Sequence, residues 1–215
     1  ALSTVTTTAG NVAIGRYALA TNTGSYNTGL GYLTLTANTT GGNNVAVGHQ
    51  AGTLVTTGAN NTIVGTSAGD ALTTGTYNTA TGFQALSAGV ASFYNTAFGA
   101  NALQTDTTGR HTVAVGRNAL GVQNNTSSAD MYNVGVGSSA GHSNTTGVYN
   151  TFIGGKAGYS NQTSQDNTAI GYLSLFNSTG AGNTSVGAYS LFAVAGGTEA
   201  VQQAGKTTEE GPPLH

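Results

Sequence analysis

The side chains that could carry out catalysis are few and form no recognisable set. The chain holds seven acidic residues, four histidines and no cysteine among its 215 residues. Asp70, Asp106, Asp130 and Asp166 stand in four different contexts, and no two are spaced for general acid and base catalysis. The histidines also occupy unrelated positions, which argues against a shared metal site within one chain: His49, His111, His142 and His215.

Serine, threonine and glycine are abundant, but no pattern singles out a nucleophile or a phosphate-binding loop. A nucleophilic hydroxyl needs a neighbouring base and an orienting group, and neither marks any Ser or Thr in this sequence. The glycine-rich segment 40–43 lacks the lysine and the strand-to-helix setting of a phosphate loop. We therefore expect no enzyme activity, no cofactor and no catalytic or metal-binding residue.

Composition indicates an ordered, polar and nearly uncharged protein. Only 6% of residues are charged and 34 are glycine, yet 38% are hydrophobic and the net charge is −2. Disordered chains combine high net charge with few apolar residues. Five Lys and Arg residues spread along the chain form no basic patch, so we expect no nucleic-acid partner. The apolar runs are too short for insertion into a membrane, and the opening ALSTVTTTAG lacks the regions of a signal peptide.

An internal repeat of about 17 residues organises most of the chain. We number its columns from the start residue, column zero, which is Asn in ten of eleven repeats. Column one holds Val or Thr, and column three is apolar in ten of eleven repeats. The repeats start at these residues: Asn11, Asn27, Asn44, Asn61, Asn78, Asn95, Thr112, Asn133, Asn150, Asn167 and Asn183.

Column four is glycine in every repeat, which predicts a backbone turn with positive φ or a close approach between chain segments. Columns seven and eight usually read Ala-Leu or Ala-Gly, as in Ala85–Leu86 and Ala51–Gly52. The Asn and Gly columns form the predicted structural ladder, in which Asn amides bond from coil to coil. The glycines of column four are Gly15, Gly31, Gly48, Gly65, Gly82, Gly99, Gly116, Gly137, Gly154, Gly171 and Gly187.

Val or Thr alternating with apolar residues predicts strands, and frequent Gly, Thr and Asn clusters predict turns. We therefore expect an all-β fold, a parallel β-roll or β-solenoid of eleven coils and about 50 Å long. Residues 1–10 are interpreted as the end of a truncated preceding repeat, and 11–195 as the solenoid. Residues 196–215 abandon the pattern and are interpreted as a non-repetitive exit segment or linker.

One chain offers little apolar surface for each coil. Two or three inward side chains stabilise a coil by less than the ordering of its backbone costs. A second buried face would reduce this deficit, and columns seven and eight are suited to close approach of another chain. We therefore predict a homotrimer.

The repeats resemble a known family. The sequences NVAIG at Asn11, NVAVG at Asn44, TVAVG at Thr112 and NTAIG at Asn167 resemble the head repeats of YadA-like trimeric adhesins. The longer form NTAIGYLSL is similar to repeats of phage tail fibres and related fibrous adhesins. The resemblance extends from Asn11 to about residue 192. It implies an extracellular trimer of parallel β-rolls, on a cell surface or a virion tail fibre, that presents a surface for a glycan or protein receptor.

Two features are candidates for receptor contact. Tyrosine precedes column zero in five repeats, where it either forms a stacking surface or shields the coil edges, and we favour shielding. The interval 118–132 contains four extra residues, and an insertion in a solenoid maps to a loop on one face, often the binding face. The candidate contact residues there are Asn124, Asn125, Ser127, Ser128, Asp130 and Tyr132.

The expected function is that of a structural and adhesive fibre, a rigid trimeric spacer or head. An ice-binding β-solenoid is the alternative, because regularly spaced Thr on a flat face can match a lattice. That function needs outward-facing Thr, whereas column one shares a face with apolar column three, so we expect its Thr to point inward. A glycan-cleaving tailspike with an active site between subunits is a further, weaker alternative.

Overall fold

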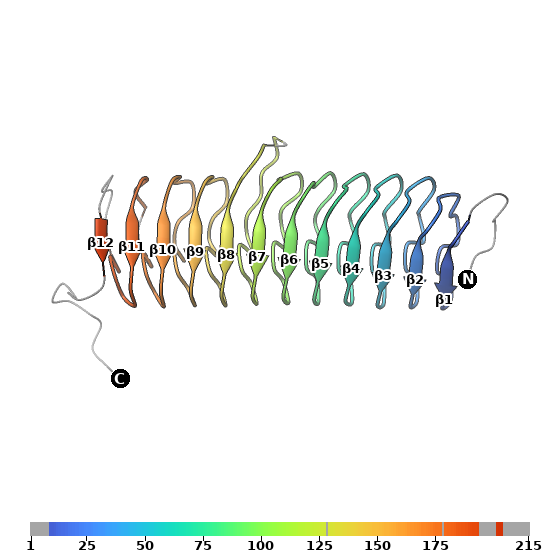
Figure 1. The fold of residues 1–215 in the computed structure, drawn as a ribbon, viewed down its shortest axis with the longest axis horizontal. Helices are drawn as coiled ribbons and strands as arrows, with labels where there is room; N and C mark the ends of the chain where they lie inside the picture. The colour runs from blue at the N-terminus through green and yellow to red at the C-terminus, as the bar shows by residue number, and fades with distance from the viewer. Residues whose placement is uncertain (1–8, 128, 178, 194–200, 204–215) are drawn as a thin grey trace.

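The computed structural model describes residues 9–127, 129–177, 179–193 and 201–203. These residues contain no helix and form twelve short parallel strands, which pair in sequence order within one sheet. Figure 1 shows the strands side by side along a rod. The strands are β1 Val12–Ile14, β2 Thr28–Leu30, β3 Val45–Val47, β4 Thr62–Val64, β5 Thr79–Thr81, β6 Thr96–Phe98, β7 Val113–Val115, β8 Val134–Val136, β9 Thr151–Ile153, β10 Thr168–Ile170, β11 Thr184–Val186 and β12 Val201–Gln203.

Equivalent columns of neighbouring repeats pair directly. Thr62 pairs with Thr79, one repeat length further along the chain. The longest interval keeps the same register, since Val113 pairs with Val134 despite the four extra residues between them. The repeat is therefore one coil of a parallel β-solenoid, as the sequence predicts.

The glycine of column four lies where neighbouring coils approach most closely. Its φ is between 123° and 137° in all eleven coils, a region that L side chains rarely adopt. A Cβ on Gly82 would lie 2.6 Å from the carbonyl carbon and oxygen of Gly99, and a Cβ on Gly99 would meet Gly116 at the same distance. Because these neighbours are backbone atoms that cannot swing aside, only glycine fits column four.

The sheet extends beyond the predicted end of the repeats. β12 lies within 196–215 and pairs with β11, with Thr184 opposite Val201. These partners are 17 residues apart, so the sheet continues by one strand past residue 195, where the repeat pattern is predicted to end. The strand was hidden because its coil lacks both the Asn and the Gly that mark the others. Residues 1–8, most of the predicted truncated repeat, lie outside the described residues.

The inward and outward faces of the strands are the reverse of the prediction. Column two is the inward column, and Ala80, Ala97 and Ala114 are fully buried in it. Columns one and three point outward, so that Ile14 is 58% exposed and Phe98 is 54% exposed. The expectation that the Thr residues of column one point inward is therefore wrong. Alternation fixes which columns share a face but not which face is buried, and here the small residues face the narrow interior.

Columns seven and eight complete the interior of each coil. Ala85 and Leu86 are fully buried, as are Ala102 and Leu103 one coil later. They belong to one continuous core cluster along the rod. The prediction that these columns meet another chain is wrong, because they are already covered by their own.

The choice of Leu or Gly in column eight follows the size of the inward residue in column two. Coils with Ala in column two mostly carry Leu in column eight, as in Ala80 with Leu86. The large exceptions in column two are Ile63 and Phe152, and both are fully buried. A Cβ on Gly141 would lie 2.5 Å from the ring of Phe152, and a Cβ on Gly158 would overlap that ring. Glycine in two successive coils therefore provides the volume that one phenylalanine fills.

Candidate recognition surface

The Asn column is a buried structural ladder rather than a set of functional amides. The Nδ2 of Asn78 donates to the carbonyl oxygen of Ser92 at 2.8 Å and to Oδ1 of Asn61 at 3.1 Å. Its Oδ1 accepts the backbone N–H of Asn95 at 3.1 Å. Each amide thus bonds the coil before it and the coil after it, which satisfies polar groups that are buried from water.

The ladder is interrupted once, at Thr112, and Gln123 bridges the gap. The N–H of Thr112 still donates to Oδ1 of Asn95 at 2.9 Å. Gln123 donates from Nε2 to the Thr112 hydroxyl at 3.1 Å, and its Oε1 accepts Nδ2 of Asn133 at 2.9 Å. The coil that lacks the ladder Asn is also the coil that carries the four-residue insertion.

The insertion forms the loop between β7 and β8, which projects beyond the other turns in Figure 1. Asn125 is buried, and its Oδ1 accepts the N–H and the hydroxyl of Ser127 at 2.8 and 2.7 Å. Its side chain therefore shapes the loop and is not available to a receptor. Ser128 lies outside the described residues. The exposed members of the predicted contact set are Asn124, Ser127, Asp130 and Tyr132.

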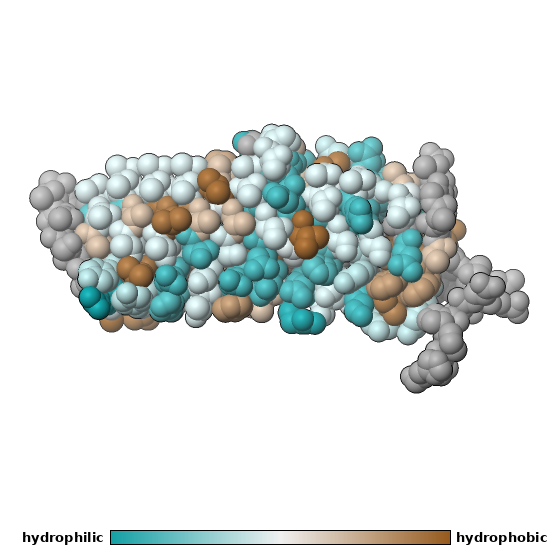
Figure 2. All heavy atoms as spheres, turned by 180° about the vertical axis from the view of Figure 1, so that it is seen from behind, coloured by the Kyte–Doolittle hydropathy of each residue, from teal (hydrophilic) through white to brown (hydrophobic). Residues whose placement is uncertain are grey.

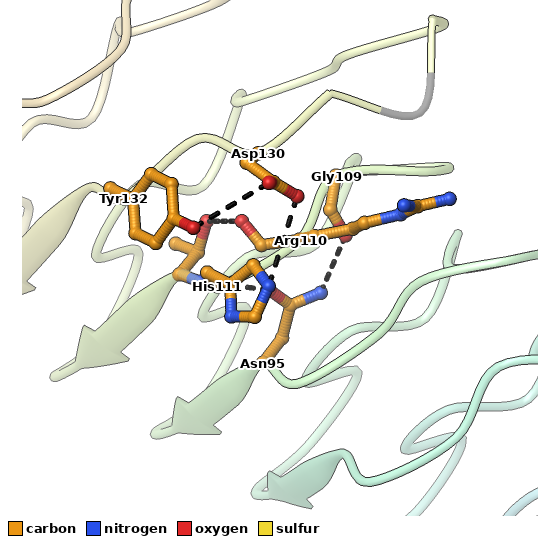
Figure 3. Close-up of polar contacts among 7 residues, drawn as sticks. Asn95, Gly109, Arg110, His111, Asp130 and Tyr132 are labelled. Atoms are coloured by element: carbon orange, nitrogen blue, oxygen red, sulfur yellow. Dashed lines mark hydrogen bonds and ion pairs between the residues drawn. The ribbon is translucent and has the colours of Figure 1, made fainter.

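Beside the loop, polar and aromatic side chains from two coils meet (Figure 3). Oδ1 of Asp130 lies 3.7 Å from Nε2 of His111, which is an ion pair when the imidazole is protonated. Oδ2 of Asp130 accepts from the hydroxyl of Tyr132 at 3.5 Å. Both distances exceed the usual hydrogen-bond range of up to roughly 3.2 Å. The Asp130 carboxylate is nearly half exposed, so it can accept a further donor from a ligand.

His111 also belongs to a row of stacked rings in the column before column zero. Successive ring centroids are 5.0–5.8 Å apart and the rings are within 11° of parallel. Both faces of the three interior rings are covered by their neighbours, so the row exposes ring edges and hydroxyls. This arrangement supports shielding over a sugar-stacking platform. We call this row the ring ladder, and its members are Tyr77, Tyr94, His111, Tyr132 and Tyr149.

Two members of this surface were not predicted from the sequence as contacts. His111 stands in the column of the tyrosines, and this position is the signal that could have identified it. Arg110 precedes it and stacks its guanidinium over the ring of Phe93, with 5.1 Å between CZ and the ring centroid. The sequence offers no periodic signal for Arg110, because its column holds a different residue type in almost every coil.

Among the described residues, the remaining titratable groups do not form a metal-binding cluster. In the part of the chain that the structure describes, no group of three or more His, Asp or Glu side chains could hold a metal ion. The same residues include no helix long and apolar enough to cross a membrane. The His111–Asp130 pair is the one ion pair within those described ranges.

Comparisons with known proteins identify no relative of this chain. No family model matches the sequence, and searches of curated proteins and of solved structures returned no significant match.

Proposed function

We propose that this chain is a structural and adhesive fibre segment, a rigid homotrimeric spacer that presents a recognition surface outside a cell or on a virion. The observation that carries this proposal is the outward face of the sheet, formed by columns one and three of β1–β11. We call it the sheet face. It is apolar or Thr-lined at all eleven coils and contains no charged residue.

The size and composition of the sheet face fit contact between copies of the chain. Eleven three-residue strands, about 4.8 Å apart and about 10 Å long, form a strip of about 500 Å². Monomeric proteins rarely expose apolar patches larger than a few hundred Å². The stacked rings beside the strip add to its area and bring it toward the roughly 800 Å² that each partner contributes to a standard interface. By contrast, the side of the rod seen in Figure 2 carries its apolar residues in separate small groups.

The trimer is tested by placing charges on the sheet face. The double variant Thr62→Glu/Thr79→Glu should sediment as a monomer in analytical ultracentrifugation, because the carboxylates would be buried without partners in the assembly. The matched control is Thr40→Glu/Thr57→Glu, which alters exposed turn residues of adjacent coils and should remain trimeric. A wild-type chain that sediments as a folded monomer, or an unaffected Thr62/Thr79 variant, would contradict the proposal.

The insertion loop is the proposed receptor contact, with a surface glycan or protein as the partner. It projects from the rod, and the only ion pair of the described residues lies at its base. Replacing the exposed residues Ser127 and Asp130 by Ala should leave the trimer intact and abolish attachment to cells. Attachment equal to that of the wild type would assign recognition to another part of the fibre.

An ice-binding solenoid is the second candidate, and the orientation of column one favours it. Seven of the eleven column-one residues are Thr, and they point outward in one row along the sheet. Column three beside them mixes Leu30, Thr81 and Phe98, so the face is uneven and poorly matched to a lattice. Thermal hysteresis in a freezing assay would support ice binding. A chain without thermal hysteresis would favour the fibre function over ice binding.

A further inference from the structure

We propose that Asp106 and Gln123 position the insertion loop from inside the coil stack, so that the recognition surface is held in one shape before any receptor binds. Asp106 occupies a column that holds Asn in four other coils, and it is fully buried. Burial raises the pKa of Asp106, and hydrogen bonds from Gln123 and from backbone N–H groups act in the opposite direction. A buried carboxyl therefore stands where a neutral amide serves elsewhere.

The carboxylate is needed because three donors converge on it. Oδ2 of Asp106 accepts Nε2 of Gln123 at 3.0 Å. Oδ1 accepts the N–H of Gly109 at 3.0 Å and the N–H of Asn125 at 3.4 Å. In regular coils the equivalent Asn38 uses its Nδ2 as a donor, to Asn22 and to the carbonyl of Gly41. An amide has only one acceptor oxygen, so it cannot serve Gln123 and the loop backbone together.

The same coil holds the beginning of the loop at further points. The hydroxyl of Thr107 donates to Oδ1 of Asn124 at 3.0 Å, and that of Thr108 donates to the carbonyl of Asn125 at 2.5 Å. These bonds fix the residues that lead into the loop. Its first residues therefore rest on the turn of the preceding coil.

The C-terminal end of the loop is hydrogen-bonded to the backbone of Arg110. Its carbonyl accepts the N–H of Met131 at 3.0 Å, and its N–H donates to the carbonyl of Ala129 at 3.3 Å. Both ends of the loop are thus bonded to residues 106–110. We call these bonds between residues 106–110 and the two ends of the loop the clamp. Asp106 connects the clamp to the Asn ladder through Gln123, which bonds Asp106 on one side and Thr112 and Asn133 on the other.

The test is hydrogen exchange of the full chain as an intact assembly, followed by mass spectrometry of its peptides. Asp106→Asn should make the amides of 123–131 exchange about tenfold faster or more, because the new amide NH2 cannot accept Nε2 of Gln123 as Oδ2 did, so the bond between Gln123 and residue 106 is lost. Peptides that contain β5 and β10 should exchange at the wild-type rate. Asp130→Asn is the control, because the exposed Asp130 carboxylate contacts His111 and Tyr132 rather than residues 106–110, and the change should leave exchange unchanged.

Each outcome decides the proposal. Unchanged exchange in 123–131, or equal acceleration in all coils, would overturn it, since the first shows no positioning and the second shows general destabilisation. Gln123→Ala should reproduce the local effect through the same clamp. The positioning of the loop by Asp106 does not depend on the proposed receptor role. Only the biological purpose of that positioning rests on the proposed function. If Asp106→Asn loosens the loop but binding to a printed panel of cell-surface glycans is as strong as in the wild type, the receptor assignment fails and the positioning role stands.

Discussion

Phe152 and Gly158 should behave as one shared volume in the core, and a double-mutant cycle can measure this. Phe152 is the largest fully buried side chain, and glycines 141 and 158 leave the space that its ring occupies. In five other coils Ala in column two is combined with Leu in column eight, as in Ala80 with Leu86. The pair Phe152→Ala and Gly158→Leu would convert one arrangement into the other within a single coil.

Each single change should be costly and the two together should be mild. Removing a buried Phe ring costs about 3–5 kcal/mol of unfolding free energy, including the cavity it leaves. Leu at position 158 beside the intact ring overpacks the coil by about 1–3 kcal/mol. Backbone strain adds little, because Leu86 already adopts φ 50° and Gly158 has φ 60°. In the double variant Leu fills most of the cavity, so the cost should fall below about 2 kcal/mol.

The cycle is measured by chemical denaturation at one fixed protomer concentration, because association would otherwise shift the midpoints. The expected coupling energy between the two sites is about 3 kcal/mol. Phe83→Ala is the control for losing an exposed aromatic ring, and it should cost less than about 1 kcal/mol. If the two single costs simply add in the double variant, the two columns do not share one volume and our account of the core is incorrect.

Three further predictions test the ladder, the glycine column and the buried carboxyl. Asn78→Ala removes three hydrogen bonds and should cost about 3 kcal/mol in denaturant unfolding, whereas a cost below about 1 kcal/mol would mean that the ladder is incidental. Gly99→Ala places a Cβ 2.6 Å from the backbone of Gly116 at φ 136°, so it should lose the cooperative melting seen by circular dichroism, and wild-type melting would refute the close approach. Because burial raises the pKa of Asp106 above its usual 3.8, the folded chain holds this proton more tightly than the unfolded chain. Its contribution to stability therefore falls as pH rises above about 4. Melting curves at several pH values should show this fall in the wild type and a flatter profile in Asp106→Asn, and parallel profiles would count against it.

The sequence predicts the coil, its register and its ladders, because these depend on repetition alone. A column that is Asn in ten coils and another that is always Gly identify equivalent positions without any knowledge of packing. The orientation of the strands could not be obtained in the same way. Val and Ile in columns one and three suggested an interior on their side of the strand, but most coils take a small residue such as Ala in column two, and the larger residues of columns one and three lie outside.

The candidate site was predicted only as far as its position in the chain. The insertion showed itself as a change in spacing, which located the loop and its exposed residues. The residues that support the loop could not be recognised from the sequence, because Asp106 and Gln123 lie in one column where other coils carry Asn, Val, Leu, Gly or Ser. His111 was equally hidden, since it joins the ring ladder as a single imidazole among tyrosines. A single departure from the repeat cannot be distinguished from neutral variation until the residues that it contacts in the structure are known.

The columns of the repeat have separate structural roles, which explains why the chain repeats itself so closely yet can accommodate a projecting loop. Columns zero, two, four, seven and eight are fixed by the amide ladder, the core and the close approach of backbones, so a change in one coil disturbs its neighbours. The insertion occurs in the one coil that starts with Thr112, where Gln123 replaces the missing amide contacts and is itself bonded to Asp106 of the preceding coil. In this solenoid the projecting loop stands where buried side chains re-form the ladder around it. The shape of the proposed recognition surface therefore depends on polar residues in the interior as well as on the residues that a receptor would touch.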